Sequence, residues 1–100
     1  MRLADKVVKV RSKNAGPFWV TIDVFCGAPD VLAAVSAQLP AERVAALYQQ
    51  PVETLKRFEI PDIFALKFSL PRPVVQGSRD DRDMHGAQYA VLLAELELDD

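Results

Sequence analysis

Side chains that bind anions gather in one short segment near the start of the chain, Arg11–Pro17, which reads RSKNAGP. Its Asn and Gly tolerate the positive φ angles of a turn and its Pro interrupts strand pairing, so we predict a loop between two strands. Such a turn does not require consecutive Arg, Ser and Lys residues. These donors, with backbone N–H groups, suit a carboxylate or a phosphate. The candidate anion ligands are therefore Arg11, Ser12, Lys13 and Asn14; the alternative is a solvated turn.

A second polar segment, Pro71–Asp83, reads PRPVVQGSRDDRD and holds three arginines and three aspartates. As a functional loop it would order over an anion or against a partner chain, which adds Arg72, Ser78 and Asp83 to the candidate binding residues. The alternative is a surface loop whose opposite charges neutralise one another. The aspartates lack the spacing of an EF-hand, so no metal site is predicted.

His85 follows this segment and is the one histidine of the chain. Because histidine titrates near neutrality, His85 is a candidate acid, base or anion ligand, and the alternative is local packing in a first helical turn. Cys26 lacks a partner set that would activate it and is predicted to pack in the core. The sequence contains no dinucleotide fingerprint, P-loop, nucleophile elbow or C-x-x-C motif, so no cofactor is predicted and enzyme activity is left open.

Composition limits the classes of protein that fit. One hundred residues, half of them hydrophobic, suit a single domain over residues 1–100. Twelve basic and fourteen acidic side chains give a net charge of −2, which argues against a nucleic-acid partner. No apolar stretch is long enough to span a bilayer, and the first residues lack the apolar region of a signal peptide. We therefore expect no membrane partner and a cytoplasmic location.

Hydrophobic spacing predicts the elements that position these residues. Lys6–Arg11 is rich in valine and is predicted to be a strand. Phe18–Phe25 alternates, with one face formed by Phe18, Val20, Ile22 and Val24 and the other by Trp19, Thr21, Asp23 and Phe25. A helical region begins near Pro29 and restarts after Pro40 over Ala41–Gln49.

The second half of the sequence also predicts two strands followed by a helix. Strands are predicted around Phe58 and Ile60 and over Leu66–Leu70. Asp83 would cap a last helix, whose apolar stripe is formed by Met84, Ala87, Val91, Ala94 and Leu98, widened by Leu92. Together these elements predict an α+β, ferredoxin-like two-layer sandwich: a four-stranded antiparallel sheet with two helices on one face, in the permuted order ββαββα. The other face, with Trp19 and Phe25, is a candidate docking surface.

Several stretches resemble a known bacterial family. RSKNAGPF (residues 11–18), LPRPV (70–74) and GSRDDRDMHGAQ (77–88) are similar to a small family that accompanies AtuA, the acyclic-terpene-utilisation protein, as a separate chain or a fused C-terminal domain. AERV (41–44) and RFEIP (57–61) resemble the AtuA-like ferredoxin-fold domain, so the resemblance spans nearly the whole chain. In that family the position of His85 is often tyrosine, which argues against an essential catalytic role for His85.

The resemblance implies a partner and a class of ligand. We expect an accessory subunit or detached domain of an AtuA-like large chain, whose polar loops complete a carboxylate or acyl-CoA site, with hydration or dehydration as the reaction. The setting would be branched-chain, hydroxy-acid or acyclic terpene catabolism. The alternative is a non-catalytic oligomerisation module with no ligand site of its own, which includes a homo-oligomer. Convergence of the two polar segments into one concave pocket would favour the first hypothesis.

Overall fold

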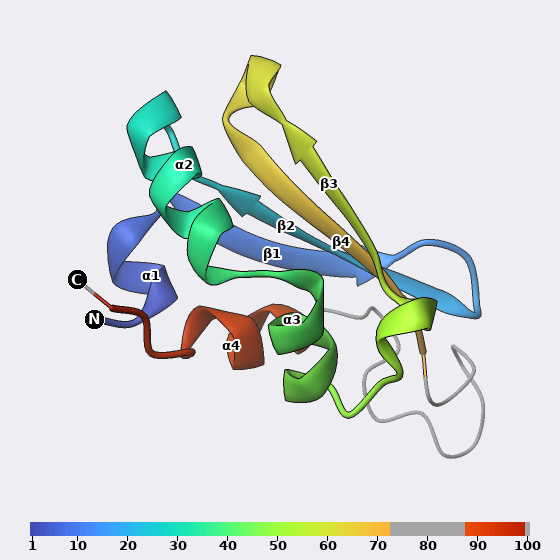
Figure 1. Cartoon of the computed structure of the whole chain (residues 1–100). Helices are drawn as coiled ribbons and strands as arrows, with labels where there is room; N and C mark the ends of the chain where they lie inside the picture. The colour runs from blue at the N-terminus through green and yellow to red at the C-terminus, as the bar shows by residue number, and fades with distance from the viewer. Residues whose placement is uncertain (73–87, 100) are drawn as a thin grey trace.

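The alternating segment predicted over residues 18–25 forms an inner strand of a four-stranded sheet. The computed structural model describes residues 1–72 and 88–99. In chain order the elements are α1 (Leu3–Lys6), β1 (Lys9–Asn14), β2 (Trp19–Phe25), α2 (Pro29–Gln38), α3 (Ala41–Leu47), β3 (Lys56–Ile60), β4 (Ala65–Pro71) and α4 (Tyr89–Ala94), with 3-10 turns at Val52–Thr54 and Pro61–Ile63 (Figure 1).

The strand order is β1-β2-β4-β3, and every neighbouring pair is antiparallel. β2 and β3 both pair with β4, so they run parallel to each other on its two sides, and α2 and α3 connect them. Moving the last strand of a ferredoxin-like sheet to the front of the chain produces this order. The predicted α+β two-layer fold with a permuted strand order is confirmed.

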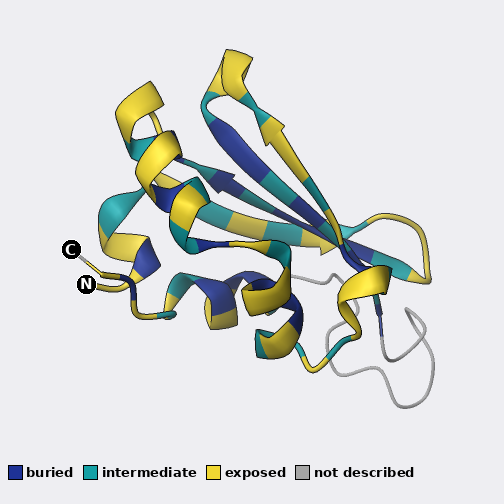
Figure 2. Cartoon of the chain, in the orientation of Figure 1, coloured by how far each residue is buried: buried dark blue, intermediate teal, exposed yellow. Residues whose placement is uncertain are grey.

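One face of the sheet, here called the inner face, packs against the helices and forms the core (Figure 2). Its fully buried side chains come mainly from the two central strands, with helix residues packed over them: Val20, Ile22, Val24, Leu66, Phe68, Leu70, Val35, Val44 and Leu93. Burying each such side chain is worth about 1.5–3 kcal/mol. The predicted inward set on β2 is confirmed except for Phe18, which precedes the strand and is 60% exposed.

The structure corrects the beginning of the chain. The first strand is Lys9–Asn14 rather than Lys6–Arg11, and a short helix, α1, precedes it. α1 forms because it buries Leu3, whose backbone N–H donates to the carbonyl of Leu96 at 2.9 Å. β1 continues to Asn14 because its backbone pairs with β2 up to Val20, and this pairing outweighs the weak strand preference of Ser, Lys and Asn.

The end of the chain also differs from the prediction. α4 covers only Tyr89–Ala94, and its buried residues are Ala90 and Leu93, whereas Val91 is 57% exposed. Leu98 is buried not on a helix but in an extended segment, where its N–H donates to the Met1 carbonyl at 2.8 Å. The buried residues of α4 each lie one position before a member of the predicted stripe, Val91 or Ala94, so the stripe was wrong by one position. Met84, Ala87 and the predicted cap Asp83 lie outside the described residues.

Pro40 separates α2 from α3, as predicted, and leaves the last carbonyls of α2 without partners inside the helix. α2 has no basic residue in its last turn, and an arginine on β3 takes that role. Arg57 donates from Nε to the Leu39 carbonyl and from Nη2 to the Ser36 carbonyl, both at 2.9 Å. The half-buried Arg57 thus joins the sheet to the end of α2.

Replacing Arg57 with Met removes this charged cap and keeps most of the side-chain volume. We expect Arg57→Met to lower the free energy of unfolding by about 1.5–3 kcal/mol, because it deletes hydrogen bonds from a charged donor. Lys9 is exposed on the edge strand β1, so Lys9→Met should change the free energy of unfolding by less than about 0.5 kcal/mol. Urea denaturation of both variants measures the difference, and equal losses would contradict the role given to Arg57.

Candidate functional site

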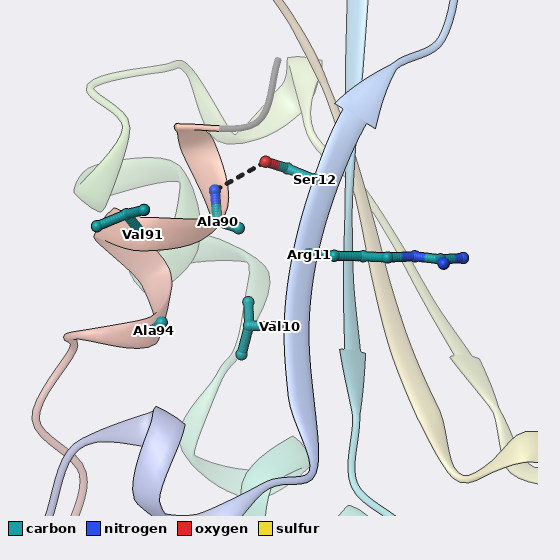
Figure 3. Close-up of a pocket in the computed structure, with 6 residues that line it drawn as sticks. All are labelled: Val10, Arg11, Ser12, Ala90, Val91 and Ala94. Atoms are coloured by element: carbon teal, nitrogen blue, oxygen red, sulfur yellow. Dashed lines mark hydrogen bonds between the residues drawn. The ribbon is translucent and has the colours of Figure 1, made fainter. Parts of the chain in front are cut away.

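The four candidate residues at the start of the chain lie on a strand and not in a loop, which corrects the prediction for this segment. Successive side chains of a strand point to opposite faces. Ser12 is paired with the core residue Ile22 and Lys13 with Thr21 of the other face. Figure 3 shows the Arg11 side chain on the opposite side of β1 from α4, and Ser12 directed toward α4. The structure therefore places Arg11 and Lys13 on the outer face and Ser12 and Asn14 on the inner face.

Asn14 meets the second predicted segment where β4 ends. Arg72 Nη1 donates to Asn14 Oδ1 at 2.5 Å, and the Arg72 backbone N–H donates to the Phe18 carbonyl at 2.8 Å. Arg72 is only 8% exposed and is the one buried charged side chain in the described part of the chain. A buried guanidinium requires well-placed acceptors, which Asn14 supplies. The two predicted segments thus come together through Asn14 and Arg72.

Ser12 lies beside a small pocket between β1 and α4. Its Oγ accepts a hydrogen bond from the Ala90 N–H at 2.8 Å, which satisfies a donor at the start of α4 (Figure 3). The pocket has a volume of about 280 Å³, and the residues that line it are Val10, Arg11, Ser12, Ala90, Val91 and Ala94. Most of this lining is aliphatic, and the lining includes neither Asn14 nor Arg72. The pocket lining therefore includes two of the predicted anion ligands, Arg11 and Ser12, but not the contact between Asn14 and Arg72.

A tyrosine pair that no sequence motif indicates fixes α4 against α3. Tyr48 follows α3, and its hydroxyl donates to the Tyr89 carbonyl at 2.5 Å, with the two ring centroids 5.8 Å apart. Burial raises the pKa of the Tyr48 phenol well above its usual value. Tyr48 thus stays protonated and serves as a donor that holds the start of α4 in place. Helical spacing over residues 41–49 does not reveal where the Tyr48 hydroxyl points.

The sheet face opposite the helices, here called the outer face, carries charged and aromatic side chains. The strand register aligns Arg11, Asp23, Lys67 and Phe58 in one row across the sheet. The outer-face cations are Lys9, Arg11, Lys13, Lys56 and Lys67, and the aromatic residues are Trp19, Phe25 and Phe58. Asp23 is the one carboxylate on the strands of this face.

Contacts on the outer face link cations to aromatic rings. Arg11 Nε lies 3.5 Å from Asp23 Oδ2, and its guanidinium lies 5.0 Å from the centre of the Phe25 ring. Lys56 Nζ lies 5.5 Å from the centre of the Trp19 ring. Both arrangements fall within the range of cation–π attraction. Trp19 and Phe25 lie on this face, as predicted, and both are half-buried.

β3 presents its apolar side chains to the outer face. Phe58 and Ile60 are paired with Lys67 and Ala65, whereas Arg57 and Glu59 point toward the helices. Glu59 accepts a hydrogen bond from the Ser36 hydroxyl of α2. Phe58 is 47% exposed. The polar side of this strand thus fixes α2, and an aromatic ring is left at the surface.

The structure does not describe every residue that the sequence singled out. Ser78, Asp83 and His85 lie outside the described residues. Cys26 is buried, as predicted, and burial raises the pKa of its thiol. Within residues 1–72 and 88–99, no three His, Cys, Asp or Glu side chains lie close enough to hold a metal ion. Across the same ranges, none of the helices has the length and apolar character needed to span a membrane.

Comparison with known protein families places the chain. Residues 3–97 match the family described as a domain of unknown function, DUF4387, and the chain belongs to that family. The match includes every helix and strand described above and leaves out residues 1–2 and 98–100. No curated protein and no solved structure matches the chain significantly.

The alternation along β1 predicts opposite effects for neighbouring substitutions. Asn14→Ala removes an acceptor from the buried Arg72 guanidinium, so we expect the free energy of unfolding to fall by about 1–3 kcal/mol. Lys13→Ala changes an exposed side chain and should alter it by less than about 0.5 kcal/mol. Guanidinium denaturation of the two variants gives the comparison. If both substitutions leave the free energy of unfolding unchanged, Asn14 does not support Arg72.

The buried Tyr48 hydroxyl predicts a pH dependence. At pH about 7, Tyr48→Phe should lower the free energy of unfolding by about 1 kcal/mol, because the Tyr89 carbonyl loses its donor. Above pH about 10 the unfolded chain releases the phenol proton and the folded chain retains it, so this group's contribution to wild-type stability declines as pH rises. The gap between wild type and variant should therefore narrow between pH about 7 and about 11. Denaturation at both pH values tests this, and a constant gap would contradict it.

Proposed function

We propose that this DUF4387 protein is an accessory subunit that binds a larger chain through the outer face of its sheet. The observation that carries the proposal is the orientation of β3, which turns Phe58 to the surface and Arg57 and Glu59 toward the helices. An exposed ring on the same sheet face as Trp19 and Phe25 is a typical centre of a protein interface. Covering these rings with a partner would recover the apolar burial that the isolated chain lacks.

The resemblance to the AtuA-associated family supports the class of partner, an AtuA-like large chain. In the complex, Arg72 would contribute to a carboxylate or acyl-CoA site, since a guanidinium recognises a carboxylate through charge-assisted hydrogen bonds. Its contact with Asn14 supports this role because it fixes the direction of the guanidinium. Hydration or dehydration of the ligand would then require residues of the larger chain as well.

One observation favours the alternative, an assembly module without a ligand site. The pocket between β1 and α4 has a mainly aliphatic lining and is small, at about 280 Å³. Ligand pockets usually occupy about 300–1,000 Å³ and include a few convergent polar groups. Under this alternative the complex forms through the same outer face, but substitution of Arg72 leaves carboxylate binding by the complex unchanged.

Co-expression with an AtuA-like chain from the same organism tests the proposal. We expect the two chains to co-purify and to elute as one species in size-exclusion chromatography with light scattering. Phe58→Ser should weaken the affinity at least tenfold, as truncation at an interface centre commonly costs about 2 kcal/mol or more. Trp19→Ala should act in the same direction.

Val91→Ser is the matched control, because Val91 is at least as exposed as Phe58 but lies on α4, in the helical layer. It should leave the affinity unchanged. Failure of the chains to associate would refute the accessory-subunit proposal. If Val91→Ser weakens the complex and Phe58→Ser does not, the interface lies on the helical layer instead.

A further inference from the structure

We infer that the surface of the larger chain that docks on the outer face is acidic. This inference rests on the proposed accessory role and adds the chemistry of the partner. The outer face carries five cationic side chains and one carboxylate, Asp23. The whole chain has a net charge of −2. Within residues 1–72 and 88–99, the acidic side chains other than Asp23 lie in helices or connecting segments or, in the case of Glu59, point toward the helices. Such a separation of charge favours a partner of opposite sign.

The one carboxylate does not balance these cations. Asp23 pairs with Arg11 at 3.5 Å and lies opposite Lys67 on the neighbouring strand. In the described part of the chain, Lys9, Lys13 and Lys56 form no ion pair. Lys9 and Lys13 are exposed two positions to either side of Arg11 on the same strand, so their ammonium groups are available to carboxylates of a partner.

The same charges argue against a second copy docking face to face. Two outer faces in contact would bring lysines against lysines, and like charges in close contact are unfavourable. The positions of the aromatic rings favour a protein surface over single-stranded nucleic acid. Stacking of bases requires a series of accessible ring faces. Here Lys56 lies over Trp19 and Arg11 over Phe25, which leaves Phe58 as the exposed ring on this face.

A charge-reversal experiment tests the inference on the full-length chain. Lys9→Glu/Lys13→Glu reverses two exposed charges of the outer face, and we expect its affinity for the AtuA-like chain to fall at least tenfold. The control is Arg2→Glu/Lys6→Glu at the two ends of α1, which produces the same change in net charge away from the outer face. It breaks only exposed contacts, to Asp5 and to the Asp99 carbonyl, and should leave the affinity within about twofold. Circular dichroism verifies that both variants are folded.

Salt provides a second readout. Raising NaCl from about 50 mM to about 500 mM should weaken the wild-type complex at least tenfold, because screening reduces attraction between exposed charges. The Lys9→Glu/Lys13→Glu complex should respond much less. A complex that is indifferent to both salt and charge reversal would overturn the acidic partner and leave the accessory role standing. Absence of any complex, with wild type at about 50 mM NaCl, would overturn both.

Two further measurements test whether the outer face binds nucleic acid or a second copy of the chain instead. A fluorescein-labelled oligo(U) of about 20 nucleotides should not bind wild type at micromolar concentration, whereas strong nucleic-acid binding would appear well below that level. Light scattering of the protein alone should show no dimer that dissociates in high salt. Tight oligonucleotide binding abolished by Lys9→Glu/Lys13→Glu, or a salt-sensitive homodimer abolished by it, would overturn the inference.

Discussion

The pairing of β2 with β4 is the constraint on which the rest of the structure depends. These two strands supply six of the fully buried side chains of the inner face, and they separate the edge strands β1 and β3. Because side chains alternate along paired strands, burying Val20, Ile22 and Val24 fixes the face of every residue aligned with them. Ser12 and Asn14 must then join the helical side, and Arg11 and Lys13 must face outward.

The same register explains why the helical layer is held by polar contacts at its edges and apolar contacts at its centre. β4 presents Leu66 and Phe68 inward, and on β3 the paired positions are Glu59 and Arg57. These side chains lie at the margin of the sheet, where they reach Ser36 and the last carbonyls of α2. At the opposite margin, Ser12 and Asn14 have the equivalent role for α4 and Arg72.

The sequence predicted the architecture because its strongest signals are the alternating apolar residues of β2 and β4 and the proline between α2 and α3. It did not predict the faces of the edge strands, because these strands bury few apolar side chains. In β1, Ser12 and Asn14 resemble turn residues, and only pairing with β2 makes them strand residues. In β3, Phe58 and Ile60 suggest an inward face, but inward placement of Arg57 satisfies the carbonyls that Pro40 leaves at the end of α2.

The candidate site follows from these edge strands rather than from the core. The anion ligands predicted as one cluster, Arg11 to Asn14, are divided by the sheet into two surfaces. On the inner side, Asn14 holds Arg72 and links the two polar segments of the sequence. On the outer side, Arg11 and Lys13 share the sheet face with three other cations, Lys9, Lys56 and Lys67, and two of the five cations lie over aromatic rings. A helical layer could not cover such a face without burying several charges, and the cost of burying unpaired charges keeps that face out of the core.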